Sequence, residues 1–222
     1  MNRIARKTAA IALAAAAALF ALPAGAIELG WTAGPMSSTG DTICTNGTLV
    51  YAYAVQRVTV GDVSFVRTPD LDSADMVSVS PNHAKLSGGS FGDDGATGDY
   101  AAMLRDGWSW GSNGDGNYLA YTLTLFGLEA GKTYLVQLVC HRQSNSMLVS
   151  ANGSNSVHVH GADEANYKYG ASITGVFMAT ASTENVVVTY TNQTGDRPLN
   201  AIQVRELPSD EPAGKPAVIT VR

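Results

Sequence analysis

The stretch LAYTLTLFGLEAGKTYLVQLVC, residues 119–140, contains two segments in which apolar side chains recur at every second position. In residues 119–125 leucine and tyrosine alternate with alanine and threonine, and residues 134–140 repeat the spacing after a short loop. A period of two is typical of β-strands, because successive side chains point to opposite faces of a sheet. The stretch therefore predicts two consecutive strands of an all-β fold.

The flanking sequence extends this prediction to most of the chain. Residues 49–55 are apolar on both faces, which indicates a central strand, and residues 57–66 predict a tight hairpin around Gly61. Residues 99–104 favour one short helix, capped by Asp99. Further strands are expected at residues 76–80, 157–160, 172–179, 186–191 and 199–205. Short strands at intervals of about 8–12 residues, joined by turn residues, predict an antiparallel β-sandwich.

The N-terminus has the pattern of a secretory signal peptide, residues 1–26. A short basic segment precedes an apolar run over residues 9–22, and Ala-Gly-Ala at residues 24–26 supplies a cleavage site. The run is shorter than the roughly 20 residues that span a bilayer, so we expect no membrane insertion after cleavage. The mature chain is predicted to be secreted, periplasmic or attached to the cell surface.

The charge of the chain argues against one class of partner. The 222 residues include 14 Lys and Arg against 19 Asp and Glu, which gives a formal net charge of −5. Residues 1–26 contain three of the basic residues and no acidic ones, so the rest of the chain carries −8. Nucleic-acid binding depends on basic patches, so we expect no nucleic-acid partner. The remaining length suits one domain over residues 27–207, followed by a Pro- and acid-rich tail over residues 208–222.

Cys44 and Cys140 are the two cysteines of the chain. In an oxidising compartment such a pair can form a disulfide, which here would close a loop of roughly a hundred residues. Two separate buried thiols are the alternative. Of the two, we expect the disulfide.

Four segments, in this order, resemble a family of secreted modules. They are NGTLVYA at residues 46–52, the hairpin at 58–65, GLEAGKTYLVQL at 127–138 and LNAIQVR at 199–205. Together they are similar to the jelly-roll modules of secreted proteins from planctomycete- and lentisphaera-type bacteria. Those modules are similar in turn to galactose-binding-like and carbohydrate-binding β-sandwiches. The resemblance covers residues 27–207 and implies a jelly-roll sandwich of the galactose-binding-like kind.

The segment after the predicted helix contains candidates for a ligand site. Two tryptophans stand one residue apart there, so in an extended segment both rings lie on one face. Aromatic rings that stack on a sugar, beside amide, carboxylate and guanidinium groups, make a shallow site for a neutral ligand. The other interpretation, which is favoured of the two, is that one or both rings pack in the core or at its rim. The candidate ligand-binding residues are Trp108, Trp110, Asn113, Asp115, Tyr167 and Arg142.

The loop over residues 93–99 is rich in oxygen ligands. Asp93, Asp94 and Asp99 are weak candidates for a structural Ca²⁺, which takes six to eight oxygen ligands. Aspartate and glycine are also ordinary turn residues, so a plain loop is the alternative. We expect no other cofactor.

The letters GWSWG, residues 107–111, match the nucleophile elbow of hydrolases. The elbow requires a strand before the serine and a helix after it, whereas here a predicted helix precedes and a Gly- and Asn-rich loop follows. No pair of carboxylates stands out for glycoside hydrolysis. We therefore expect no catalytic residue and no enzymatic activity.

These observations favour a secreted, non-catalytic, carbohydrate-binding-like module that attaches to extracellular glycan. The alternative is a structural or adhesive module of the cell surface, whose partner is a protein. A secreted hydrolase is the least favoured of the three.

Overall fold

The computed structural model describes residues 30–71, 74–80, 92–110, 120–141, 147–150, 157–159, 165–191 and 197–209. The predicted signal peptide and most of the predicted tail lie outside these ranges and stay predictions. Within them, no helix is long and apolar enough to cross a membrane.

The larger of two sheets has seven strands in the order β1-β11-β8-β14-β2-β4-β3. Neighbouring strands are antiparallel except β2 and β4, which are parallel. The exception arises because the chain reverses direction twice between them, once before β3 and once in the β3–β4 hairpin. The strands are β1 Gly30–Pro35, β2 Thr48–Ala54, β3 Val58–Val60, β4 Val63–Arg67, β8 Thr133–Cys140, β11 Ala171–Met178 and β14 Ala201–Glu206.

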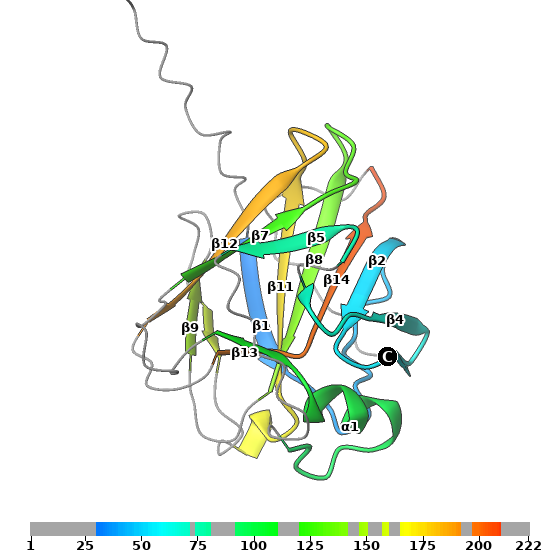
Figure 1. Ribbon diagram of the computed structural model, residues 1–222, viewed down its shortest axis with the longest axis vertical. Coiled ribbons are helices and arrows are strands. Elements are labelled where there is room, and N and C mark those ends of the chain that lie inside the picture. The colour runs from blue at the N-terminus through cyan, green and yellow to red at the C-terminus, as the bar shows by residue number, and fades with distance from the viewer. Residues whose placement is uncertain are drawn as a thin grey trace, which may run out of the picture.

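The second sheet has five strands in the order β10-β9-β12-β7-β5, all antiparallel. It covers one face of the larger sheet, as Figure 1 shows for β5, β7 and β12 crossing in front of β8, β11 and β14. A short pair of strands, β6 and β13, forms a two-stranded sheet of its own. The bounds are β5 Val77–Ser80, β7 Ala120–Leu125, β9 Met147–Ser150, β10 Val157–Val159, β12 Glu184–Thr191, β6 Trp108–Trp110 and β13 Arg197–Leu199.

These two layers confirm the predicted all-β sandwich. The two strands expected within residues 119–140 are β7 and β8, and the apolar segment at residues 49–55 is β2, which lies inside the larger sheet between β14 and β4. The predicted hairpin is β3–β4, with Gly61 at φ 56° in its turn. A positive φ of this kind is what glycine permits without steric cost.

The predicted helix is present as α1, Gly98–Arg105, but its cap differs from the prediction. Thr97, not Asp99, is the N-cap residue, and its side chain makes no capping hydrogen bond. Asp99 lies inside the first turn, where its carboxylate accepts a hydrogen bond from the backbone N–H of Thr59 at 2.8 Å. The aspartate therefore fastens α1 to β3 rather than capping the helix.

Two hydrophobic cores lie on opposite faces of the larger sheet. The core between the sheets takes alternate residues of the facing strands, such as Tyr134, Val136 and Leu138 of β8. The second core lies on the outer face of β2, β3 and β4, and includes Tyr100 and Leu104 of α1. The alternation of side chains along each strand thus supplies both cores.

The predicted disulfide between Cys44 and Cys140 is wrong, because both cysteines are free and buried. Cys140 continues the alternation of β8 after Leu138, which places it in the core between the sheets. Cys44 belongs to a small cluster with Leu135, and its N–H donates to Oε1 of Gln137 at 3.0 Å. Since Leu135 and Gln137 lie on the other face of β8, the sheet itself separates the two thiols.

Residues 42–47 run across the outer face of the larger sheet and are held there by buried polar side chains. Gln137 and Gln203 each donate to a carbonyl oxygen of this segment, at 3.1 and 3.0 Å. Arg205 donates to three more of its carbonyl oxygens, at 2.8, 3.0 and 2.8 Å. Five carbonyl oxygens of the segment thus accept hydrogen bonds from side chains of the sheet.

Candidate functional site

One end of the sandwich gathers α1, the short 3₁₀ helix η2 (Ala165–Tyr167) and the C-terminal end of β8. Figure 1 shows α1 together with this end at the bottom of the view. We call it the helical end. Backbone pairing explains why these segments meet: Cys140 at the end of β8 pairs with Ala171, which begins β11 shortly after η2.

Asn200 joins the end of α1 and the end of β8 to the corner between β13 and β14. Its side chain is fully buried, and its Nδ2 donates to the carbonyl oxygens of Leu104 (3.0 Å) and Asp106 (2.9 Å) at the end of α1. Its Oδ1 accepts the backbone N–H of His141 at 2.7 Å. One amide therefore closes the end of the helix, the end of β8 and the corner between β13 and β14.

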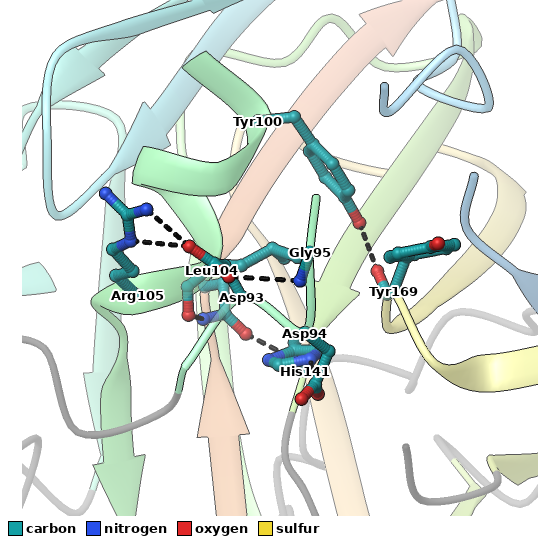
Figure 2. A network of polar contacts seen from close by, with 9 residues as sticks. Asp93, Asp94, Gly95, Tyr100, Leu104, Arg105, His141 and Tyr169 are labelled. Carbon is teal, nitrogen blue, oxygen red and sulfur yellow. Dashed lines mark hydrogen bonds and ion pairs between the residues drawn. The ribbon is translucent and has the colours of Figure 1, made fainter. Parts of the chain in front are cut away.

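His141 and two aspartates fasten the loop before α1 to the same end, as Figure 2 shows. The His141 imidazole, fully buried, contacts Oδ2 of Asp94 through Nε2 at 3.0 Å. Asp93 accepts a hydrogen bond from Nε of Arg105 at 2.7 Å and forms an ion pair with the same guanidinium. It also accepts the N–H of Gly95 at 3.1 Å. The two neighbouring aspartates thus point to different partners.

Burial and hydrogen bonding set the charge state of this network. Burial lowers the pKa of the His141 imidazole below its ordinary value, and the attraction of Asp94 offsets this only in part. His141 is therefore neutral near pH 7. The pKa of the Asp93 carboxyl is lowered, chiefly by its hydrogen bonds to Gly95 and Arg105. The carboxylate remains charged over the physiological range.

Two tyrosines beside η2 supply the aromatic surface of the helical end. Tyr167 and Tyr169 are both half-buried, the first packed against the core between the sheets and the second against the core under α1. The Tyr100 hydroxyl donates to the carbonyl oxygen of Tyr169 at 2.6 Å, which fixes the backbone there. The ammonium of Lys168 lies 5.3 Å from the centre of the Tyr169 ring, within the range of a cation–π contact.

The structure corrects one of the six predicted ligand residues. The Trp108 side chain is 0% exposed, and its Nε1 donates to the carbonyl oxygen of Thr68 at 3.2 Å. The prediction that its ring contacts a ligand is therefore wrong. The ring packs in the core between the sheets instead. Tyr167 lies at the helical end as a half-buried side chain. The side chain of Trp110, and the whole of Asn113, Asp115 and Arg142, lie outside the described residues.

The three weak calcium candidates do not converge on one point. Asp93 bonds Arg105, Asp94 bonds His141, and Asp99 bonds the backbone of β3. Across the ranges that the structure describes, no group of three or more His, Cys, Asp and Glu side chains could hold a metal ion.

The hydrolase motif does not form a nucleophile elbow. Ser109 lies in β6, which follows a helix and pairs antiparallel with β13 through Pro198. The elbow requires the serine at a sharp turn from a strand into a helix. The motif is therefore a match of letters only.

Sequence reasoning missed the residues that build the helical end. Asn200 follows Leu199 in a predicted strand, where nothing in the sequence distinguishes a buried amide from a turn residue. Asp93 and Asp94 were singled out as oxygen ligands, but their partners Arg105 and His141 come from other elements. The one usable signal was the pair of acidic residues just before a helix.

Comparison with known proteins adds little to this picture. No family model matches the chain, and no characterised protein matches it in sequence. Among solved structures the chain is similar to β-glucuronidase 2 of Bacteroides uniformis, solved with a covalently bound cyclophellitol-6-carboxylate aziridine, at 17% identity and a TM-score of 0.39. The match covers 71% of this chain and 18% of that one, so the chain spans less than a fifth of that enzyme's length.

Proposed function

We propose that the protein is a secreted, non-catalytic module that binds extracellular glycan, built as a jelly roll of the galactose-binding-like kind. The support for a jelly roll is that the chain passes repeatedly from one sheet to the other: from β7 in the smaller sheet to β8 in the larger, back to β9 and β10 in the smaller, then to β11 in the larger and β12 in the smaller. Jelly rolls are double-sheet sandwiches with connections of this kind.

The observation that carries the proposal is the placement of Tyr167 and Tyr169. Two half-buried aromatic side chains flank Lys168 at one end of the sandwich, on a backbone fixed by Tyr100. An aromatic ring that is partly buried is held in one orientation and still presents an edge or face on which a sugar can stack. A site of this kind needs polar groups beside the rings, and Lys168 is one.

The rigidity of the helical end supports the same function. Shallow sites bind weakly when their groups must be ordered on binding, so a pre-organised frame raises affinity. Asn200 and the Asp94–His141 contact provide such a frame without using the exposed side chains. The polar groups that anchor the end are thus distinct from those that would touch a ligand.

A glycan array followed by titration calorimetry tests the proposal. We expect a neutral oligosaccharide to bind, and Tyr167→Ala and Tyr169→Ala each to weaken it by about fivefold to tenfold, the loss of one stacking contact. Phe126→Ala is the matched control, because Phe126 is a half-buried aromatic residue outside the helical end. Absence of binding across the array would overturn the proposal. Capture of a surface protein instead would replace it with the adhesive alternative.

A further inference from the structure

A hollow lies at the opposite end of β8 from the helical end. Its volume is about 250 Å³, and it opens where β14 ends between the first residues of β2 and β8. These strand ends lie toward the top of Figure 1, where β8 begins and β14 finishes. Eight residues of β8 at about 3.3 Å each separate the two places by some 25 Å. The hollow is therefore a separate feature of the molecule.

The floor of this hollow is fixed by backbone contacts. The N–H of Leu207 donates to the carbonyl oxygen of Thr133 at 2.8 Å, which continues the pairing of β14 and β8 past the end of β14. Gly47 packs so closely on Glu206 that a Cβ there would lie 2.3 Å from the Glu206 carbonyl oxygen. Arg205 donates to the carbonyl oxygen of Gly47 at 2.8 Å. The hollow is thus preformed and does not depend on a ligand to shape it.

The charged groups of the hollow neutralise one another. Nζ of Lys132 donates to Oε1 of Glu206 at 2.8 Å, and the two side chains are 46% and 32% exposed. The Glu206 hydrogen bond raises the pKa of Lys132, so the ammonium is charged at neutral pH. An exposed pair of this kind contributes little stability. The Lys132–Glu206 pair presents an ammonium donor and carboxylate acceptors side by side with no net charge. Such a pair suits a ligand with hydroxyl groups better than it suits a charged ion.

The remaining walls have the same mixed character. Thr48 and Ser209 contribute hydroxyl-bearing side chains, and Pro208 contributes an exposed apolar ring. A pyranose has hydroxyls around its edge and a patch of C–H groups on its face, so it needs this combination. An inorganic anion needs several donors without a carboxylate nearby, and Glu206 disfavours it.

We propose that this hollow binds one neutral sugar unit, with Lys132 and Glu206 hydrogen-bonding its hydroxyls and Pro208 covering its apolar face. The site goes beyond the glycan site proposed at the helical end and stands whether or not that site exists. Where both bind, one molecule engages two sugar units from opposite ends of the sandwich.

Amide NMR spectra of the protein, titrated with neutral monosaccharides, test this site. We expect glucose, galactose or another member of the panel to shift the amides of residues 131–133, 207 and 209 in a saturable way. Sodium phosphate and sodium acetate, at matched ionic strength, should shift these amides less. Signals from residues 167–170 report the helical end in the same spectra, so failure of either site is seen separately.

Two variants and a control sharpen the result. Ser209→Trp places a bulky side chain at the exposed rim and should weaken sugar binding by at least about tenfold. Ser182→Trp carries the same change at an exposed serine outside the hollow and should leave the titration unchanged. Glu206→Gln should weaken sugar binding and strengthen the response to phosphate, because Lys132 loses its partner. The proposal is overturned if no sugar shifts these amides, if the anions act at lower concentration, or if Ser209→Trp binds as the native protein does.

Discussion

The side-chain oxygen of Asn200 accepts the backbone N–H of His141 at 2.7 Å, while the nitrogen of the same amide donates to two carbonyl oxygens at the end of α1. Three backbone groups from two distant parts of the chain thus share one buried side chain. No water competes for these bonds, because Asn200 is 0% exposed. The amide joins the C-terminal end of α1 to the end of β8, while Asp99 fastens the first turn of the helix to β3.

Asn200→Ala should therefore be one of the most destabilising single changes at the helical end. It leaves three buried backbone groups without their partner, and each such group costs about 1–3 kcal/mol. Allowing for relaxation, we expect the free energy of unfolding to fall by about 3 kcal/mol, measured by urea denaturation. Asn185→Ala is the control, since Asn185 is exposed and accepts a hydrogen bond from Thr124 across the sheet. Equal, small losses in the two variants would contradict the role given to Asn200.

The two cysteines should behave as buried thiols. Burial raises the pKa of Cys140 to about 12, and it also raises that of Cys44, so neither is a thiolate at pH 8. Because the thiolate is the reactive form, alkylation of the folded protein should be slow at both positions. Unfolding without reductant should expose two titratable thiols per chain. Fewer than two would show that a disulfide forms despite the separation of the two side chains across the sheet.

The strands were predictable where a local pattern decides the structure. The spacing of apolar residues along the chain is enough to predict β7 and β8, in which they alternate, and β2, which is apolar on both faces. β1 was missed because GWTAGP contains two glycines and a proline, and it becomes a strand only by pairing with β11. A pairing partner more than a hundred residues away leaves no trace in a local pattern.

The candidate site was predictable only in part, for a related reason. Tyr167 was singled out as an aromatic candidate, but the burial of Trp108 depends on Thr68 and on the core around it, which the sequence does not place beside it. The same holds for Cys44 and Cys140, since the face on which Cys44 lies is set by how residues 42–47 cross the sheet. Contacts between distant segments decided each of these cases.

His141 should make the helical end sensitive to acid. Its folded-state pKa is below the ordinary value of 6.5, so the unfolded state binds more protons once the pH falls below 6.5. The stability present at neutral pH is then lost progressively as the pH falls toward the lowered pKa. The charged groups around it are Asp94 and Asp93, with Arg105 bound to Asp93 and Lys168 on the adjacent segment.

Thermal melts between pH 7.5 and 5 would measure this loss. His141→Gln keeps a side chain that can donate to Asp94 and removes the titrating group, so its stability should vary less over this range. The pKa of the Asp93 carboxyl is lowered by its hydrogen bonds to Gly95 and Arg105, so this group stays charged over the range and contributes little to the difference. Parallel pH profiles for the native protein and the variant would show that protonation of His141 is not linked to folding.

Gly47 and Gly131 offer a matched pair of substitutions at the Lys132–Glu206 end, because both have positive φ, 77° and 84°. An alanine at either position bears the strain of left-handed backbone, about 1–2 kcal/mol. At Gly131 the new Cβ meets nothing within 4 Å, whereas at Gly47 it lies 2.3 Å from the carbonyl oxygen of Glu206. We therefore expect Gly131→Ala to cost about 1 kcal/mol, and Gly47→Ala at least about 2 kcal/mol more.

Urea denaturation of the two variants would measure the difference. The contact at Gly47 is with backbone, which cannot rotate away as a side chain could, so residues 45–47 must shift on the sheet. That shift also strains the bonds from Arg205 to this segment. Equal losses in the two variants would mean that the segment moves freely, and that the floor of the hollow beside Glu206 is not fixed by close packing of backbone against backbone.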